Sequence, residues 1–403
     1  MDRVILHCDC NNFYASVESV RHPEYKTVPM AVCGDPKSRH GIILAKNELA
    51  KAYGVKTAET IWQAQQKCPN LLLVPPHHDE YHRYSMKINA LYQQYTDRVE
   101  PFGIDESWLD VTGSQLLFGS GKEIADRIRK EIRETFGISV SVGVSFNKIF
   151  AKLGSDYKKP DATTVIDRTN WKKLLYPLPV TDLLFVGKST ASVLDTLAVR
   201  TIGDLAVLDR CFLTKRLGKA GEQLWRYANG LEQSPVARYE EVLASVPKSV
   251  GNGTTYAHNL IGMDELKPAI LSLCDEVSAR MRRHGVKCHT LQLQIKSPDF
   301  KVIQRQRPLP RPTSAPKELC EVACSILKEC WSETSPVRML TVTGTNLTTQ
   351  DVGEQMSFLA EFDETRHEKL ERLGSALDTV RDKYGYSAVS FGSLLPKKEK
   401  ESK

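Results

Sequence analysis

Long apolar runs are missing from this sequence. A membrane-spanning helix needs roughly 20 predominantly apolar residues, and no stretch of the chain approaches that length. The apolar run nearest the first residue, Val4 to Leu6, ends at His7 and is too short for the apolar part of a secretory signal. We therefore expect a soluble, cytoplasmic protein that has no membrane partner.

Cys-x-x-Cys pairs are also missing, although the chain contains ten cysteines. Such pairs are typical of zinc sites and redox-active disulfides. Cys8 and Cys10 fall in or beside a predicted strand, and Cys320, Cys324 and Cys330 fall on one predicted helix. Because free cysteine behaves as a small apolar residue, we interpret these thiols as core residues, with a metal or disulfide site as the less favoured alternative.

Internal repeats are absent as well. The 403 residues are 41% hydrophobic and 26% charged, which is ordinary for a globular protein. Strand and helix patterns alternate to about residue 168, a helical stretch with short loops follows, and a second mixed region begins at Lys248. The sequence therefore predicts an α+β multidomain protein. The predicted parts are residues 1–168, 169–232, a linker at 233–247, 248–350 and 351–403.

Periodicity predicts the elements of the first part. Ile124, Ile128, Ile132 and Phe136 recur every four residues, as on one face of a helix. A hairpin broken at Gly103 is predicted over residues 99–111. The other predicted strands are 3–8, 28–33, 41–45 and 139–145, and the other predicted helices are 46–53, 60–67, 84–95 and one from residue 147.

Acidic residues are nearly absent between residues 278 and 311. This stretch contains nine lysines and arginines but only one acidic residue, Asp299, whereas the whole chain has a net charge of +6. The rest of the chain is therefore slightly acidic. A local positive excess of this size favours a polyanionic partner such as nucleic acid, with a solvated surface as the alternative.

Three carboxylates are candidates for a metal site. Asp9 ends the first predicted strand, and Asp105 and Glu106 stand next to each other in the predicted hairpin. Adjacent residues of a regular strand point to opposite faces, so both can serve one site only if the chain bends there, as Gly103 allows. Three carboxylates could then hold Mg²⁺, which prefers oxygen ligands, although most such residues are ordinary surface charges.

Three segments resemble the motifs of Y-family DNA polymerases of the DinB and UmuC type. They read ILHCDCNNFYASVE at 5–18, GIDESWLD at 103–110, and SVGVSFNKIFAK at 141–152 followed by KKP at 158–160. The resemblance extends from about residue 3 to residue 392. It implies a right-hand polymerase in which Asp9, Asp105 and Glu106 are catalytic and bind two Mg²⁺ ions.

The resemblance also implies an activity. The expected reaction is template-directed, error-prone translesion DNA synthesis by two-metal phosphoryl transfer, in DNA damage tolerance. No set of exonuclease motifs is visible, so proofreading is not expected. The expected small-molecule substrates are deoxynucleoside triphosphates, and the expected state is a monomer.

The same comparison assigns a nucleotide pocket. Tyr14 corresponds to the steric gate, the ring that excludes a ribose 2′-hydroxyl, and Phe13 is its neighbour in the sequence. Helix N-termini favour anions, so the helix start at Asn12 suits a triphosphate, as do the cations Lys51 and Lys159. The segment departs from the DinB pattern, which has tyrosine and arginine where this chain has Glu48 and Lys51.

The domains follow from the resemblance. Residues 1–168 correspond to palm and fingers, 169–232 to a small helical thumb with helix-hairpin-helix-like turns, and 248–350 to the little finger. On its basic stretch, Arg282, Arg305 and Arg307 are the predicted contacts to primer-template DNA. Gln355, Met356, Ser357, Phe358 and Leu359 resemble the pentapeptide that binds the bacterial sliding clamp.

Two other functions are compatible with parts of the pattern. A DNA- and clamp-binding accessory protein with a decayed active site would keep the basic stretch and the pentapeptide. A two-metal nuclease would keep the carboxylates. The intact set of Asp9, Asp105, Glu106, Tyr14 and Lys159 argues against the accessory protein, and the steric-gate motif argues against the nuclease.

Overall fold

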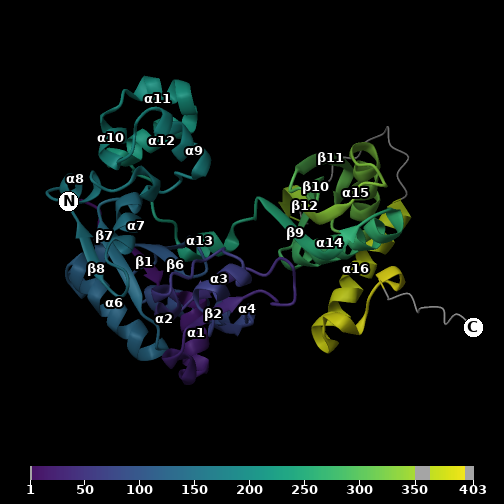
Figure 1. The fold of residues 1–403 in the computed structure, drawn as a ribbon, viewed down its shortest axis with the longest axis horizontal. Coiled ribbons are helices and arrows are strands. Elements are labelled where there is room, and N and C mark those ends of the chain that lie inside the picture. The colour runs from purple at the N-terminus through teal and green to yellow at the C-terminus, as the bar shows by residue number, and fades with distance from the viewer. Residues whose placement is uncertain (1, 350–363, 395–403) are drawn as a thin grey trace, which may run out of the picture. The chain divides into compact units, whose positions relative to one another are not determined.

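The structure is a computed structural model that describes residues 2–349 and 364–394. The chain divides into two compact units, Met1–Ala244 and Ser245–Lys403, which are described separately (Figure 1). Within the described ranges, no helix is both long enough and apolar enough to cross a membrane.

The first unit is built around a five-stranded sheet with the order β5-β6-β1-β7-β8 (Figure 1). Its central strand β1 is buried along its whole length and pairs antiparallel with both β6 and β7. The strands are β1 Ile5–Cys10, β5 Val99–Pro101, β6 Glu106–Asp110, β7 Val140–Ser145 and β8 Thr163–Ile166. The central strand therefore carries the carboxylate of Asp9, its second-last residue, to the rim of this sheet.

Four longer helices pack on this sheet, and the first three along the chain share its core. In α6, Ile124, Ile128 and Ile132 are fully buried and Phe136 packs at the margin, so the predicted stripe is confirmed. The helix begins at a capping box formed by Ser120 and ends at Gly137, where φ is 68°; a left-handed residue of this kind favours glycine. These helices are α1 Phe13–Arg21, α4 His78–Tyr92, α6 Gly121–Phe136 and α7 Lys148–Tyr157.

A second, three-stranded sheet of order β3-β2-β4 lies in the same unit. It has a small core of its own, to which Ala31, Ile43 and Ala64 contribute. Its elements are β2 Met30–Cys33, β3 Ile43–Lys46, β4 Leu72–Val74, α2 Glu48–Ala52 and α3 Ile61–Lys67.

The helical stretch after β8 forms a third core with α7. Phe150 and Leu153 of α7 contribute to it, together with Leu194 and Leu224. Short helices and turns complete the unit: η1 Pro23–Thr27, η2 Thr112–Ser114, α5 Gln115–Phe118, α8 Trp171–Leu175, η3 Val180–Asp182, α9 Lys188–Thr196, α10 Ile202–Val207, α11 Arg210–Leu217 and α12 Lys219–Ala228.

The predicted linker at 233–247 has more structure than its sequence indicated. It contains helix α13, Tyr239–Ala244, and Val236 is fully buried in a cluster with Ile5 and Trp108. The division between the units falls after Ala244. Most of this segment therefore packs with the first unit.

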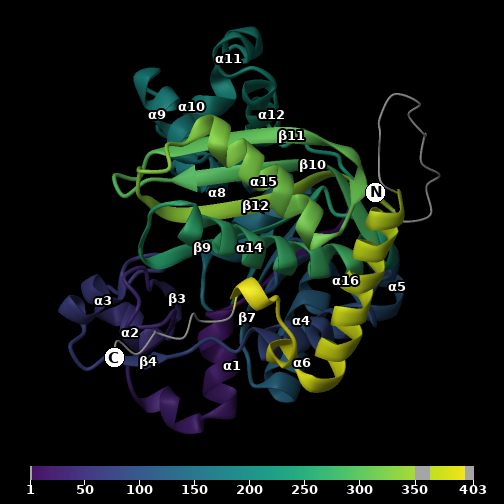
Figure 2. The ribbon, with the colours of Figure 1, turned by 90° about the vertical axis from the view of Figure 1, so that its right-hand side faces the viewer.

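The second unit contains a four-stranded sheet of order β11-β10-β12-β9. Helices α14 and α15 pack side by side across one face of it (Figure 2). The elements are β9 Ser249–Leu260, α14 Met263–Arg283, β10 Val286–Lys296, β11 Val302–Thr313, α15 Pro316–Cys330 and β12 Val337–Thr349.

A further helix, α16 Glu364–Tyr384, packs on the second unit and is followed by the short turns η4 Tyr386–Ala388 and η5 Gly392–Leu394. Both guanidinium ends of Arg381 donate to the carboxylate of Asp275, at 3.0 and 2.7 Å, and both residues are buried. A two-pronged bond of this kind between buried charges fixes the helix in one position.

The cysteines lie mostly in the cores. All ten are free; seven are buried, Cys324 and Cys330 are half-buried, and Cys211 alone is exposed. This agrees with the interpretation of core thiols.

Candidate active site

The rim of the five-stranded sheet brings the predicted carboxylates together. Asp9 lies directly opposite Glu106 in the pairing of β1 with β6. Asp105 precedes β6, and its carbonyl oxygen accepts a hydrogen bond of 2.9 Å from the backbone N–H of Cys10. All three residues therefore lie at one rim, although Asp105 and Glu106 are adjacent in the sequence.

The bend expected at Gly103 is present. The backbone N–H groups of Phe102 and Gly103 both donate to the carbonyl oxygen of Glu106, at 3.0 and 3.3 Å. A Cβ atom at position 103 would lie 3.3 Å from Cγ of Glu106 and 3.4 Å from Oδ1 of Asp105. Glycine thus closes the turn without crowding the two carboxylates.

Two lysines from α7 and the loop after it neutralise the carboxylates. The Lys152 ammonium lies 2.9 Å from Oδ2 of Asp9 and 2.6 Å from Oε2 of Glu106. The Lys159 ammonium lies 2.8 Å from the same oxygen of Asp9 and 2.7 Å from Asp156. We had expected Lys159 at a triphosphate; here both lysines bind Asp9.

Close packing of α7 on β7 puts Lys152 at the site. A side chain at Gly143 would overlap the carbonyl oxygen of Ala151, and one at Gly154 would lie 2.9 Å from Cα of Gly143. Glycine at both positions lets helix and strand approach until their backbones touch. The turn that carries Lys152 is thereby held against Asp9 and Glu106.

The pKa values follow from burial and charge. Burial, and then the negative charges of Asp9 and Glu106, raise the pKa of Asp105 to about 6. Burial acts the same way on Glu106, but its contacts with His7 and Lys152 outweigh burial and lower its pKa to about 2. Burial opposes the charge of Lys152, yet Asp9 and its other acidic neighbours raise its pKa.

His7 is a member of the site that the motifs did not indicate. Ligand atoms of His7, Asp9 and Glu106 all lie within 4.8 Å of one another, a group in which Asp105 has no part. His7 is fully buried and stands two residues before Asp9 on β1. Since residues i and i+2 of a strand share a face, this spacing was the available signal.

The donor set fits hard divalent cations. Three carboxylates converge at one rim, and an ammonium group already bridges Asp9 and Glu106, so the site accommodates positive charge between them. Burial is the main cause of the raised pKa of Asp105, and the negative charges of Asp9 and Glu106, which the lysines leave partly uncompensated, add to it. Oxygen-rich, incompletely neutralised sites of this kind suit Mg²⁺.

Tyr14 lies at the start of α1 and stacks on Tyr81 of α4, with ring centroids 4.0 Å apart and planes at 15°. The Tyr81 hydroxyl donates to Glu18 at 2.6 Å, and both residues are fully buried. Burial, and then the charge of Asp105, raise the pKa of Tyr14. Phe13 is a core residue with 3% exposure.

The remaining predicted nucleotide contacts are linked by Glu48. The side-chain amide of Asn12 donates to Glu48 at 2.8 Å, and the Lys51 ammonium lies 3.5 Å from the same carboxylate. Asn12 is the N-cap of α1 with φ of 50° and makes no side-chain cap bond. Asn11 is buried and donates to Ser141 at 2.9 Å, which makes it a structural residue.

The three arginines predicted to bind DNA differ in their surroundings. Arg282 has 7% side-chain exposure; its Nε donates to Asp378 at 2.6 Å and a terminal nitrogen to the Ser314 carbonyl at 2.9 Å. A phosphate contact would have to break this ion pair, which argues against the predicted DNA contact of Arg282. Arg307 pairs with Glu329, and Arg305 is exposed.

Strand register distinguishes the two faces of this sheet. Arg305 and Arg307 lie opposite the buried Leu293 and Leu291, so both arginines belong to the face that α14 and α15 cover, at its open edge. The other face carries a row of uncharged polar side chains. They are Gln292, Gln294, Gln304, Gln306, Thr341 and Thr343, with Lys296 at one end.

The two helix-hairpin-helix-like turns are not equivalent. Phe185, which stands where the motif usually has glycine, has φ of 72°, and the N-cap Gly187 of α9 has no side-chain cap. In the second turn, Thr201 and Asp204 form a capping box and Gly203 packs on Tyr176. The second turn is therefore satisfied by its own side chains, which favours a packing role.

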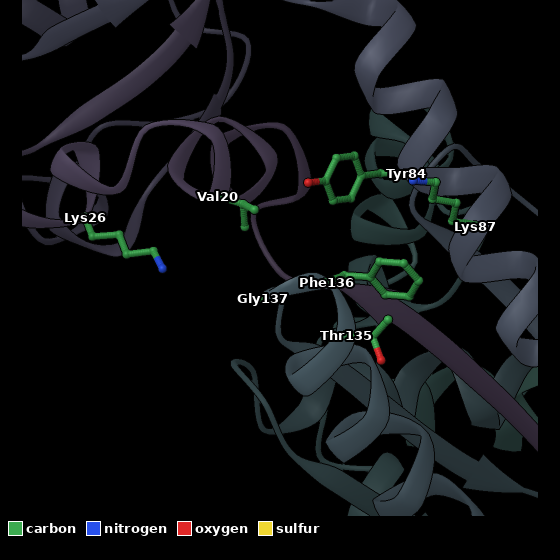
Figure 3. Close-up of a pocket in the computed structure, with 7 residues that line it drawn as sticks. All are labelled: Val20, Lys26, Tyr84, Lys87, Thr135, Phe136 and Gly137. Atoms are coloured by element: carbon green, nitrogen blue, oxygen red, sulfur yellow. The ribbon is translucent and has the colours of Figure 1, made fainter.

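The described first unit also contains a cavity away from the carboxylates. About 440 Å³ in volume, it lies beside the C-terminal ends of α1 and α6 and includes Val20, Tyr84 and Phe136 among its lining residues, with Lys26 and Lys87 at its sides (Figure 3). No carboxylate lines it, so it is separate from the candidate active site.

The pentapeptide Gln355–Leu359, the predicted clamp-binding segment, lies outside the described residues.

Sequence and structural comparisons agree with this geometry. Residues 8–156 match the impB/mucB/samB family and residues 247–358 match the C-terminal domain of that family. DNA polymerase IV of Acetivibrio thermocellus is 47% identical over 396 residues, with 98% of each chain covered. DNA polymerase IV of Clostridium kluyveri is 37% identical, with 98% of this chain and 99% of the relative covered.

A solved structure has the same fold. A Y-family DNA polymerase chimera has a TM-score of 0.76 and 26% identity, and the match covers 86% of this chain and 99% of the chimera. The motifs, the carboxylates gathered at one rim of the sheet and the relatives aligned along nearly the whole chain together show that this protein belongs to the Y family of DNA polymerases and is a DNA-directed DNA polymerase of the translesion type.

Proposed function

We propose that Asp9, Asp105 and Glu106 hold two Mg²⁺ ions and that the chain extends a primer there by transfer of a nucleotidyl group from a deoxynucleoside triphosphate to the primer hydroxyl, with release of pyrophosphate. The observation that carries this proposal is the convergence of these carboxylates at one rim of the sheet. Bound Mg²⁺ would supply activation of the primer hydroxyl and neutralisation of the developing charge on the phosphates.

The chain's own groups would hold and orient the reactants. Lys159 pairs with Asp9 and Asp156 at the margin of the site. When a triphosphate binds there, the Lys159 ammonium group would leave these carboxylates and pair with the phosphates. The same exchange is open to Lys51, which is half exposed beside Glu48. Lys152 is more deeply buried and would remain a counter-charge to Glu106.

Tyr14 is the proposed steric gate. Its ring is pressed against Tyr81, which is itself anchored by Glu18, so the ring cannot move aside without disturbing the core. A ribose 2′-hydroxyl that met this fixed ring would overlap with it. The chain would therefore select deoxynucleotides.

The remaining assignments concern the other parts of the chain. Residues 1–168 would be palm and fingers, 169–232 the thumb and 248–350 the little finger, whose polar sheet face and edge arginines Arg305 and Arg307 would contact primer-template DNA without reading its sequence. The pentapeptide Gln355–Leu359 would bind a bacterial sliding clamp. The polymerase would act as a monomer.

Primer extension by purified single-site variants tests the proposed site. Asp105→Ala and Glu106→Ala should each lower extension by more than about 1,000-fold, since each removes a ligand that neutralises transition-state charge, while DNA binding stays within about threefold. Extension within tenfold of the parent by either variant would refute the metal assignment. An extension-deficient parent that still binds DNA would favour the accessory protein instead.

A further inference from the structure

The buried histidine of β1 faces the carboxylates with one nitrogen that lacks a partner. His7 is fully buried, and its Nε2 makes no hydrogen bond to any residue that the structure describes. Oε2 of Glu106 lies 3.4 Å from this nitrogen, which is longer than an ordinary N–H···O bond. A buried nitrogen without a partner destabilises the fold, so its position needs an explanation.

The other side of the imidazole is fixed. Nδ1 lies 2.8 Å from Oγ of Ser155 on α7, and the ring meets Trp108 edge-on with centroids 5.3 Å apart. The indole nitrogen of Trp108 donates to the Lys148 carbonyl at 3.0 Å. The direction of Nε2 is therefore set by the sheet and by α7, and it does not depend on what occupies the active site.

The contact with Glu106 favours one tautomer of the His7 ring. An ionised carboxylate only accepts hydrogen bonds, so the contact with Glu106 is attractive only when Nε2 is protonated. The Ser155 hydroxyl can then donate to Nδ1. The Lys152 carbonyl oxygen also lies 2.8 Å from Oγ of Ser155 and is an alternative acceptor for the same hydrogen. This tautomer places an N–H donor opposite the carboxylate.

We propose that His7 is a positioning residue for Glu106, with its Nε2–H directed at Oε2. The proposal rests on the proposed role of Glu106 as a metal ligand. Lys152 approaches the same oxygen at 2.6 Å, but a divalent cation would compete with that ammonium for the carboxylate. His7 does not carry a competing permanent charge and would keep the orientation of Glu106 when the ion binds.

Residues that donate hydrogen bonds to a metal ligand help to orient that ligand. Their loss typically lowers metal affinity or activity by about 10- to 100-fold. Two substitutions of His7 separate the two nitrogens. His7→Gln can place an amide N–H where Nε2 stands, whereas His7→Asn can reach only Ser155. Both are polar and of similar size, so they disturb packing alike.

The experiment measures binding of Mn²⁺ alone to the full chain, from the free-ion signal in electron paramagnetic resonance. His7→Asn should weaken binding by about 10- to 100-fold, and His7→Gln should restore it to within about threefold of the parent. The control Thr164→Val removes another buried polar atom that lacks a partner in the same sheet, the Thr164 hydroxyl, and should leave binding unchanged. Melting curves show whether each variant is folded.

The outcomes are distinct. Parental Mn²⁺ binding by His7→Asn, with loss of binding in Glu106→Ala, would overturn the role of His7 and leave the proposed metal site standing. Parental binding by Glu106→Ala would refute the metal site itself. Equal loss in His7→Asn and His7→Gln would mean that His7 acts by packing, and this too would overturn the proposal.

Discussion

Tyr14, at the start of α1, is the residue that we propose as the gate for the sugar of the incoming nucleotide. Tyr14 is held by stacking on Tyr81, and Tyr81 is held by a buried hydrogen bond to Glu18. Neighbouring aromatic residues in the sequence therefore have different environments: Phe13 is in the core with 3% exposure, whereas Tyr14 is half-buried beside the site.

Tyr14→Ala should raise the use of ribonucleotides relative to deoxynucleotides by at least about 100-fold. Each tenfold change corresponds to about 1.4 kcal/mol of differential transition-state binding. Single-nucleotide insertion kinetics with matched ribo- and deoxynucleotides measure this ratio.

The control for this prediction is Phe13→Leu. It removes a core aromatic one residue earlier, so it should lower the melting temperature while keeping the parental sugar ratio. If Tyr14→Ala were destabilised and kept the parental ratio as well, Tyr14 would be a core residue and the gate would be elsewhere.

Arginines that look alike in the basic stretch should respond differently to removal. Arg305→Ala should reduce the slope of log affinity for DNA against log salt by about 0.9, the value for one phosphate contact. Arg282→Ala should leave that slope unchanged but lower the free energy of unfolding by about 3 kcal/mol, because Asp378 loses its partner. Salt titrations and urea unfolding measure the two effects, and a reduced slope for Arg282→Ala would contradict the structural role.

At the scale of elements, the contact between α7 and β7 assembles the site. Gly143 and Gly154 allow the two backbones to touch. That contact sets how closely Lys152 approaches Asp9 and Glu106. No feature of the lysine itself in the sequence indicates this position. It depends on which small residues lie beneath the helix.

Gly143→Ala should therefore lower the free energy of unfolding by about 3 kcal/mol or more, at the upper end of what overpacking costs, and reduce primer extension as α7 is displaced. Gly113→Ala is the matched control, since a Cβ there would meet nothing within 4 Å. Urea unfolding and extension rates follow both variants. A Gly143→Ala protein as stable and active as the parent would show that the helix can shift at no cost.

On the scale of the whole molecule, the chain consists of two units with separate cores. The second unit includes α16, which lies beyond residue 358, where the match to the family's C-terminal domain ends. Its contacts to the unit include the buried pair of Arg381 with Asp275 and the pair of Arg282 with Asp378. This helix is therefore part of the fold of that unit.

Arg381→Ala should destabilise the second unit by about 3–5 kcal/mol, because it leaves the buried carboxylate of Asp275 without its partner. In hydrogen exchange, amides of β10 and β12 should lose protection while those of β1 and β7 keep it. Arg372→Ala, which breaks only an exposed pair with Glu368, should leave both regions unchanged. Equal loss of protection in both units would mean that they unfold together.

The sequence by itself determined the elements with strong patterns and the family. The stripe of α6, the apolar strand β1 and the glycine at 103 are local signals, because periodicity and backbone freedom depend on neighbouring residues only. The motifs at 5–18, 103–110 and 141–152 identified the carboxylates, whose positions follow from the ends of strands.

Only the tertiary structure decided which side chains meet across the chain. Three contacts join residues that are distant in the sequence. Lys152 bridges Asp9 and Glu106, His7 faces Glu106, and Glu18 anchors Tyr81. The same holds for Arg282, whose partner Asp378 comes 96 residues later. Local patterns predict which face of an element is buried, but the partner across that face is set by how the elements pack.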